Sequence, residues 1–228
     1  MNSGELYDLF RSDVVDTEKP YLWTDTEVFQ YMNDAYRMFV RLTGGIADVT
    51  SDVTQIPVVI GESIAEVSPL ILRFRQAWLN STGRKVQIIN QEEIEGLRRD
   101  DYGVARLVTR DNSAGPVRYM VIGEERGKVR WVQVPVAEDI VQLSVYRLPL
   151  DTIEEGDEAF EFPEIGNEHV FNLAMWMKHK AYGKQDAETF DRGRRDQYKA
   201  DFAEYCAMVT AEQDRYRAKV RSVVYGGI

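Results

Sequence analysis

The feature that most constrains the fold of this chain is a change in the spacing of its apolar residues, from helical to extended and back to helical. Residues 1–50 and 167–221 repeat apolar side chains three, four and seven positions apart, as one face of an α-helix requires. Residues 51–150 instead contain runs rich in valine, isoleucine and aromatic residues, which are typical of strands. This order predicts an α+β fold, a helical bundle built from both chain ends with an inserted antiparallel β module.

The same pattern predicts where the parts of the chain begin and end. The predicted parts are N-terminal helices over 1–50, an inserted β module over 51–150, an acidic connector over 151–166, C-terminal helices over 167–221 and a docking tail over 222–228.

The second N-terminal helix has a clear start signal. Thr24 and Glu27 fit a capping box, and Trp23 and Val28 fit the hydrophobic staple that fixes the entering chain. Apolar residues then keep helical spacing until Gly44, where the helix is expected to end.

Six strands are expected in the β module, with two hairpins, at Ser81–Gly83 and Gly123–Gly127. A short helix is expected between Gln91 and Arg99. The predicted strands are 53–60, 71–79, 85–89, 117–123, 128–135 and 140–148.

Two more helices are expected after the connector. The segment Val170–Tyr182 has apolar side chains nearly all around it, which indicates a helix surrounded by other elements. Gly183 ends it, Asp186 can cap the next helix, and that last helix continues to about residue 221. It is too long to be covered by a domain of this size, so we expect part of it to pack against another chain.

Charge and composition exclude several classes of protein. The formal net charge is -10, from 28 basic and 38 acidic residues, which argues against general nucleic-acid binding. No apolar run is long enough to span a membrane, and residues 1–10 have neither the basic start nor the apolar core of a signal sequence, so we expect a protein that neither spans a membrane nor is secreted by the usual route. The single cysteine, Cys206, allows no internal disulfide, so we expect folding in a reducing cytoplasm.

A search for catalytic or metal-binding motifs finds none. The two histidines, His169 and His179, are ten positions apart on one predicted helix, on opposed sides, where they cannot share a metal. No nucleotide-binding, zinc-binding or nucleophile-elbow motif occurs. We therefore expect no catalytic residue, no metal and no cofactor.

Three weaker possibilities compete with ordinary structural explanations. Cys206 is expected to be a buried small side chain, and a nucleophile only if a histidine approaches it. The acidic connector could supply a carboxylate pair or a calcium site, but charge runs are usually solvated surface. Arg73, Arg75 and Arg84 could bind phosphate, although strand arginines more often discourage edge pairing.

Two charged segments are candidates for contact with partners. The connector lacks basic residues, and its predicted acidic surface is Asp151, Glu154, Glu155, Asp157, Glu158 and Glu161. The C-terminus is basic and apolar, and is either a frayed helix end or an arm that orders on a partner. The candidate docking residues are Arg215, Arg217, Lys219, Arg221, Val223, Val224, Tyr225 and Ile228.

Several short motifs, in this order and spacing, resemble head-to-tail adaptor (connector) proteins of tailed bacteriophages. The resemblance covers nearly the whole chain, and its motifs are structural rather than catalytic. They are Leu22–Asp25 with Asn33 and Ala35, Val145–Pro149, Pro163–Ile165 with Glu168 and His169, and Lys180–Tyr182 with Lys184–Thr189.

The resemblance implies a homo-oligomeric ring, usually of twelve copies, between the portal protein and the tail or nozzle protein. Such a ring lines a channel for double-stranded DNA, catalyses nothing, contacts no membrane and is located at the virion neck after synthesis in the host cytoplasm. We expect residues 215–228 to reach the portal, and loops 111–115 and 124–127 to face the tail. Structural roles are expected for Trp23, Thr24, Glu27, His169 and Asp186.

Two alternatives stay open from the sequence: a carboxylate-dependent hydrolase, and an interaction scaffold with no viral connection. A hydrolase would need convergent carboxylates in a pocket, with perturbed pKa values.

Overall fold

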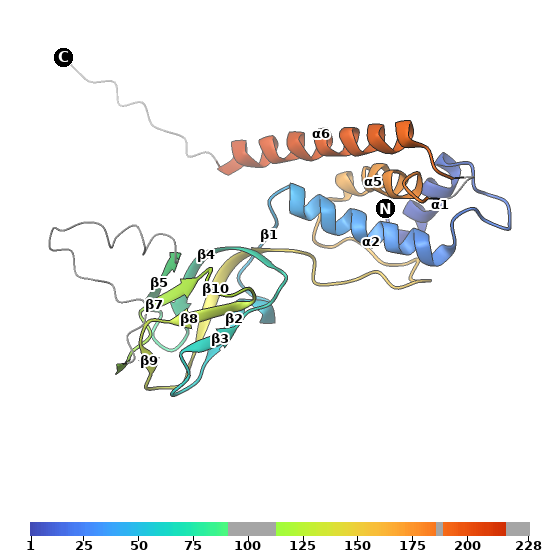
Figure 1. Cartoon of the computed structure of the whole chain (residues 1–228). Coiled ribbons are helices and arrows are strands. Elements are labelled where there is room, and N and C mark those ends of the chain that lie inside the picture. The colour runs from blue at the N-terminus through green and yellow to red at the C-terminus, as the bar shows by residue number, and fades with distance from the viewer. Residues whose placement is uncertain (91–112, 186–188, 218–228) are drawn as a thin grey trace, which may run out of the picture. The chain divides into compact units, whose positions relative to one another are not determined.

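The computed structural model describes residues 1–90, 113–185 and 189–217, which divide between two compact units (Figure 1). Unit 1 consists of Met1–Gly44 and Pro149–Ile228, and unit 2 of Gly45–Leu148. The predicted helix over 91–99 and the predicted cap Asp186 lie outside the described residues.

Helix α5 is the central helix of unit 1. It contacts α1, α2, α4 and α6, and its residues Leu173, Trp176 and Met177 are buried. The prediction that this segment is surrounded by other elements is therefore confirmed. The helices of unit 1 are α1 (Ser3–Asp13), α2 (Asp25–Leu42), α4 (Asn167–Val170), α5 (Leu173–Ala181) and α6 (Arg192–Arg217).

Helix α2 starts where the sequence predicts. The Thr24 side chain accepts a hydrogen bond from the Glu27 backbone N–H at 3.2 Å, and the Glu27 carboxylate accepts one from the Thr24 N–H at 2.8 Å. These are the two halves of the predicted capping box. Trp23 and Val28, the residues of the predicted staple, are both buried.

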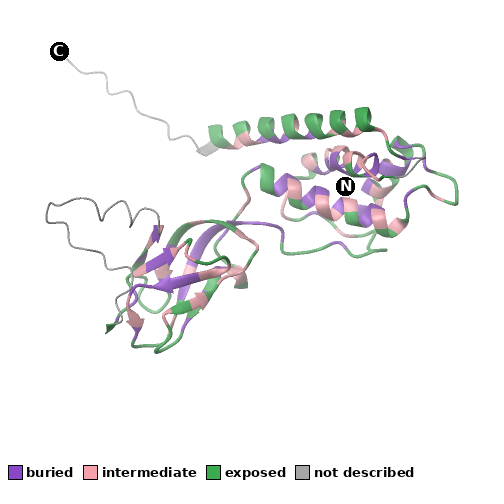
Figure 2. Cartoon of the chain, viewed as in Figure 1, coloured by how far each residue is buried: buried purple, intermediate pink, exposed green. Residues whose placement is uncertain are grey.

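The C-terminal helices differ in their bounds from the prediction. The segment expected as one helix over 170–182 is interrupted by a turn at Phe171 and Asn172, between α4 and α5. Helix α6 begins at Arg192, where the Asp191 carboxylate accepts a hydrogen bond from the Arg194 backbone N–H at 3.0 Å. Its 26 residues correspond to about 39 Å. Most of its described outer face is exposed (Figure 2).

Unit 2 is built on one curled sheet of eight strands, in the order β1-β10-β4-β5-β7-β8-β3 with β2 also paired to β10. Strand β10 pairs with three strands, since β4 lies along one of its edges while β1 and β2 lie along the other. The strands are β1 (Ile46–Asp48), β2 (Gln55–Val58), β3 (Ile64–Glu66), β4 (Ile71–Leu79), β5 (Lys85–Asn90), β7 (Tyr119–Ile122), β8 (Lys128–Trp131) and β10 (Asp139–Arg147). A second sheet pairs β6 (Ala114–Gly115) with β9 (Val134–Pro135).

Unit 2 contains both predicted hairpins and an apolar core. Both predicted hairpins are present, since β4 and β5 pair antiparallel, as do β7 and β8. Gly83 and Gly123 have φ values of 64° and 88°, a conformation that glycine adopts without strain. The buried residues of this core are Ile56, Val58, Ala77, Leu79, Val86, Val117, Met120, Val129, Trp131, Val141, Leu143 and Val145.

The predicted fold class was wrong. We expected an α+β helical bundle from both chain ends with an antiparallel β insertion, but the chain is a mixed α/β protein dominated by a large curled sheet. Three of the five described α-helices lie towards the C-terminus. The sheet is not antiparallel throughout, because β5 and β7 run parallel with Gln87 beside Tyr119. Parallel neighbours are joined by a long connection rather than a hairpin, so no local turn signal shows them in the sequence.

A buried ion pair connects the first and last strands of unit 2. Asp48 on β1 accepts a hydrogen bond from the Arg147 guanidinium on β10, and both side chains are at most 7% exposed. Burial favours the neutral form of Asp48, but hydrogen bonds from Ser51, Arg147 and Thr50 outweigh it and hold the pKa of Asp48 well below its usual range.

Asp48→Asn tests this pair. Because the pKa of Asp48 is lowered in the folded state, its charge stabilises unit 2 fully above the unfolded-state pKa of about 3.9, and this stabilisation is lost as the pH falls towards the lower folded-state pKa. We expect the substitution to lower the free energy of unfolding at pH 7 by about 3 kcal/mol, because it removes the carboxylate charge that pairs with the buried Arg147 guanidinium. The measurement is hydrogen exchange at β1 and β10 between pH 7 and pH 3.

Asp52→Asn is the matched control, since Asp52 is an exposed carboxylate in the same segment. It should keep the wild-type stability. An unchanged pH profile in Asp48→Asn would contradict the role given to this ion pair.

Candidate functional site

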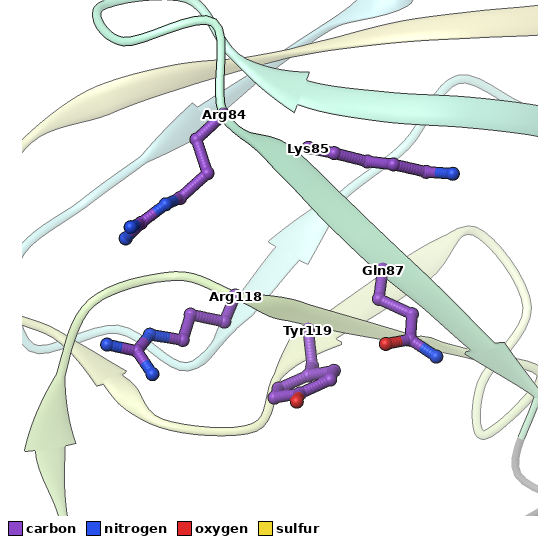
Figure 3. A pocket seen from close by; sticks show the side chains of 5 residues that line it. All are labelled: Arg84, Lys85, Gln87, Arg118 and Tyr119. Atoms are coloured by element: carbon purple, nitrogen blue, oxygen red, sulfur yellow. The ribbon is translucent and has the colours of Figure 1, made fainter.

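A surface pocket of about 470 Å³ lies on unit 2, at the start of strands β5 and β7 (Figure 3). Among the described residues, its lining contains three basic side chains and no acidic one. The lining residues are Arg84, Lys85, Gln87, Arg118 and Tyr119.

The parallel pairing of β5 and β7 brings these residues together. Gln87 and Tyr119 are register partners, and the Gln87 backbone N–H donates to the Arg118 carbonyl at 2.8 Å. Arg84 and Arg118 are the residues just before the two strands, and parallel strands begin at the same edge of a sheet. Lys85 and Gln87 alternate with the buried Val86, so their side chains lie on the outer face of the sheet.

The basic side chains of the pocket have no ion-pair partner among the residues that the structure describes. By contrast, Lys128 is paired with Glu125 at 2.7 Å and Arg130 with Glu124 at 2.5 Å. Within the part of the chain that the structure describes, the pocket is therefore a patch of positive charge on a protein of net charge -10.

The three strand arginines considered as phosphate ligands do not form one site. Arg73 and Arg75 lie over the Tyr146 ring, with guanidinium carbons 4.6 and 5.1 Å from its centroid. Only Arg84 lines the pocket, together with Arg118, which the sequence reasoning missed. Two strands that begin with basic residues are the only sequence signal for this juxtaposition, and it requires knowing that the strands are parallel.

The structure describes the whole of the predicted acidic surface but only the start of the predicted docking segment. The six acidic residues named above, between 151 and 161, are all exposed, and Glu155 accepts a hydrogen bond from Thr26 at 2.7 Å. Arg215 is exposed near the end of α6, and Arg217 is the last described residue of that helix. The remaining docking residues, Lys219, Arg221, Val223, Val224, Tyr225 and Ile228, lie outside the described residues, so docking by this segment stays a prediction.

The first predicted structural residue, Trp23, connects α2 to the segment after α5. Its indole N–H donates to the Ala181 carbonyl at 3.1 Å, and its ring meets the Tyr182 ring edge to face at 6.0 Å. Glu27 pairs with Lys184 at 2.8 Å. Burial favours neutral Glu27, but hydrogen bonds from Lys184 and Thr24 outweigh it and lower its pKa.

The Asn33 side chain on α2 forms hydrogen bonds with the backbone of the connector. Its side-chain oxygen accepts from the Ile153 N–H at 2.8 Å, while its amide donates to the Ile153 carbonyl at 2.7 Å and to the Phe29 carbonyl at 3.1 Å. Both polar groups of a buried connector residue are therefore satisfied by one side chain.

The two histidines have separate structural partners on α6. His169 Nδ1 lies 2.8 Å from the Tyr205 hydroxyl, and its ring centroid is 5.2 Å from that of Phe39. The His169 side chain, for which a structural role is expected, thus bonds a residue of α6. His179 Nδ1 donates to the Arg195 carbonyl at 2.9 Å, and burial lowers the pKa of His179.

Cys206 is 1% exposed, and burial raises the pKa of its thiol to about 12. The thiol is therefore protonated near neutral pH and is a poor nucleophile. Within the described ranges, no three or more histidine, cysteine, aspartate or glutamate side chains are grouped so as to hold a metal ion. No described helix combines the length and apolar character needed to cross a membrane.

Comparison with known proteins gives no match: neither a family model nor a curated protein sequence is similar to this chain. The function of this chain is therefore inferred from its sequence motifs and its geometry.

Asn33→Ala tests the link between α2 and the connector. It leaves the Ile153 N–H and carbonyl without their partner, so we expect a loss of about 1–3 kcal/mol in the free energy of unfolding of unit 1. Chemical denaturation measures this loss. Gln30→Ala, at an exposed position of the same helix, is the control and should change stability by at most about 0.5 kcal/mol. Equal effects of the two substitutions would argue against the bridging role of Asn33.

The reactivity of Cys206 is a second test. Because the folded-state pKa is raised, the thiolate fraction at pH 8 is small, and we expect a thiol reagent to react about 100-fold or more slowly with the folded chain than with the chain in denaturant. The reagent should be a chromogenic disulfide that releases a coloured thiol, whose absorbance measures the reaction. Because Cys206 is the only cysteine of the sequence, this absorbance reports Cys206 alone. Fast labelling of the folded protein would restore Cys206 as a candidate nucleophile.

Proposed function

We propose that this chain is a non-catalytic head-to-tail adaptor of a tailed bacteriophage. In this role, copies of the chain form a ring between the portal and the tail and line the channel for double-stranded DNA at the virion neck. The proposal rests on the resemblance of the motifs, and the structure supplies an independent reason to take those motifs together.

The observation that carries the proposal is that motifs far apart in the sequence contact one another in unit 1. Trp23, from the Leu22–Asp25 motif, bonds Ala181 and packs on Tyr182, from the Lys180–Tyr182 motif. Lys184, from the next motif, pairs with Glu27. Residues that resemble a family by chance have no reason to meet in space, whereas residues that build a shared scaffold do.

The other motif residues make contacts inside their own unit, either unit 1 or unit 2. Asp25 pairs with the buried Arg11 at 2.7 Å, and Arg147 pairs with Asp48. Glu164 accepts a hydrogen bond from the Leu150 N–H at 3.1 Å, and His169 bonds Tyr205. These polar groups serve structural contacts, which supports a protein whose role is to present surfaces.

The surface charge is compatible with a channel for DNA. The exposed acidic residues between 151 and 161 have the sign of the phosphate backbone, so a wall of such residues would repel DNA and keep it from adhering during passage. A ring of like-charged copies also requires favourable contacts between neighbours, for which the largely exposed α6 is available.

Native mass spectrometry of the chain with and without the portal protein encoded in the same genome tests the proposal. We expect a ring, usually of twelve copies, on the portal. A chain without residues 215–228 should fold, since the described core of α6 ends before them at Val209, but should bind the portal at least tenfold more weakly.

The control replaces the exposed acidic residues of the connector with neutral residues. This changes the charge of unit 1 but leaves the docking segment intact, so portal binding should be kept. Undiminished portal binding after deletion of residues 215–228 would contradict docking by that segment. Absence of the chain from purified particles, or rapid turnover of a hydrolase substrate, would contradict the adaptor function itself.

A further inference from the structure

We infer that the basic pocket of unit 2 binds the phosphate group of a nucleotide unit. The pocket is the one made by Arg84, Lys85, Gln87, Arg118 and Tyr119 at the start of β5 and β7. This inference does not rest on the adaptor function, because it follows from the pocket alone.

Two arginines provide the anion-binding part of the pocket. In Figure 3 the Arg84 and Arg118 side chains extend from the starts of the two strands towards the same side, while Lys85 extends the other way. A guanidinium offers a planar fork of N–H donors that matches phosphate oxygens two at a time. Two such forks from neighbouring parallel strands can bind one phosphate group from adjacent directions.

The charge of the pocket favours an anionic ligand. Neighbouring guanidinium groups repel each other, and no carboxylate among the described residues pairs with Arg84 or Arg118. A bound dianion removes this repulsion, so binding is favoured by relief of like charge as well as by new hydrogen bonds. By contrast, Arg130 and Arg147 in the same unit already have acidic partners and are not available for a ligand.

The size and the remaining lining indicate more than a bare phosphate ion. The pocket is open to solvent, and its volume of about 470 Å³ is larger than one oxyanion needs. Tyr119 is half-buried and offers a ring for stacking, and Gln87 beside it offers both an amide donor and an acceptor. An aromatic ring, an amide and two arginines together suit a base or sugar attached to a phosphate.

This chemistry has two sources, a free nucleotide and a nucleotide within a nucleic-acid strand. Isothermal titration of the full chain with AMP, adenosine, inorganic phosphate and a short oligothymidylate distinguishes them. We expect AMP to bind and adenosine, which lacks the phosphate, to bind at least tenfold more weakly. Oligothymidylate binding tighter than that of AMP, with strong salt dependence, identifies a strand as the source; equal or weaker binding identifies the free nucleotide.

Arg84→Gln and Arg118→Gln should each weaken AMP binding about tenfold, because each removes charge-assisted hydrogen bonds to the phosphate. Arg126→Gln is the matched control. Arg126 is an exposed arginine of unit 2 in the turn at the opposite end of β7, and its substitution should leave the affinity unchanged. Circular dichroism checks that each variant is folded.

Hydrogen exchange of the wild-type chain keeps the test decisive if a variant fails to fold. Added AMP should protect amides near residues 84–87 and 118–119. The inference is overturned if the wild type binds neither AMP nor oligothymidylate, if both pocket variants bind as the wild type does, if Arg126→Gln weakens binding equally, or if protection occurs only elsewhere.

Discussion

The pairing of the first and last strands of unit 2 is the constraint on which the rest of that unit depends. Ile46 on β1 lies opposite Arg147 on β10, and the buried ion pair with Asp48 fixes this register. Closing so long a segment costs conformational entropy, which must be offset by contacts at the closure itself. Strand β4 pairs along the other edge of β10, and β5, β7, β8 and β3 come next in the sheet.

Unit 1 depends on a different kind of contact, the covering of α5 by helices that come before and after it. Trp23 contributes most at the helix junctions, since its ring lies between Phe10 and Tyr182, at about 6 Å from each. The Arg11 guanidinium is buried beside it, paired with Asp16 and bonded to the Trp23 carbonyl at 2.7 Å. A charge in this position is stable only because all of these acceptors are present, which ties the loop between α1 and α2 to one conformation.

Local elements of this structure could be predicted well from the sequence. The start of α2 follows from Thr24 and Glu27, whose side chains bond backbone groups three residues away, and strand β4 has the bounds that its composition predicts. The fold class could not be predicted, because the parallel pairing of β5 and β7 depends on contacts between distant residues. Arg118 was not predicted as a site residue for the same reason, because only the pairing of the distant strands β5 and β7 brings it near Arg84. The break between α4 and α5 was also missed, because apolar residues continue through it.

The position of the two ends of unit 2 has a consequence for how such a chain can diverge. Neighbouring strands lie about 5 Å apart, so Gly45 and Leu148, next to the paired residues Ile46 and Arg147, begin and end the unit almost at one point. A whole sheet can therefore be lengthened, shortened or exchanged for another by recombination while the backbone of the helices that flank it in sequence needs no more than a short splice.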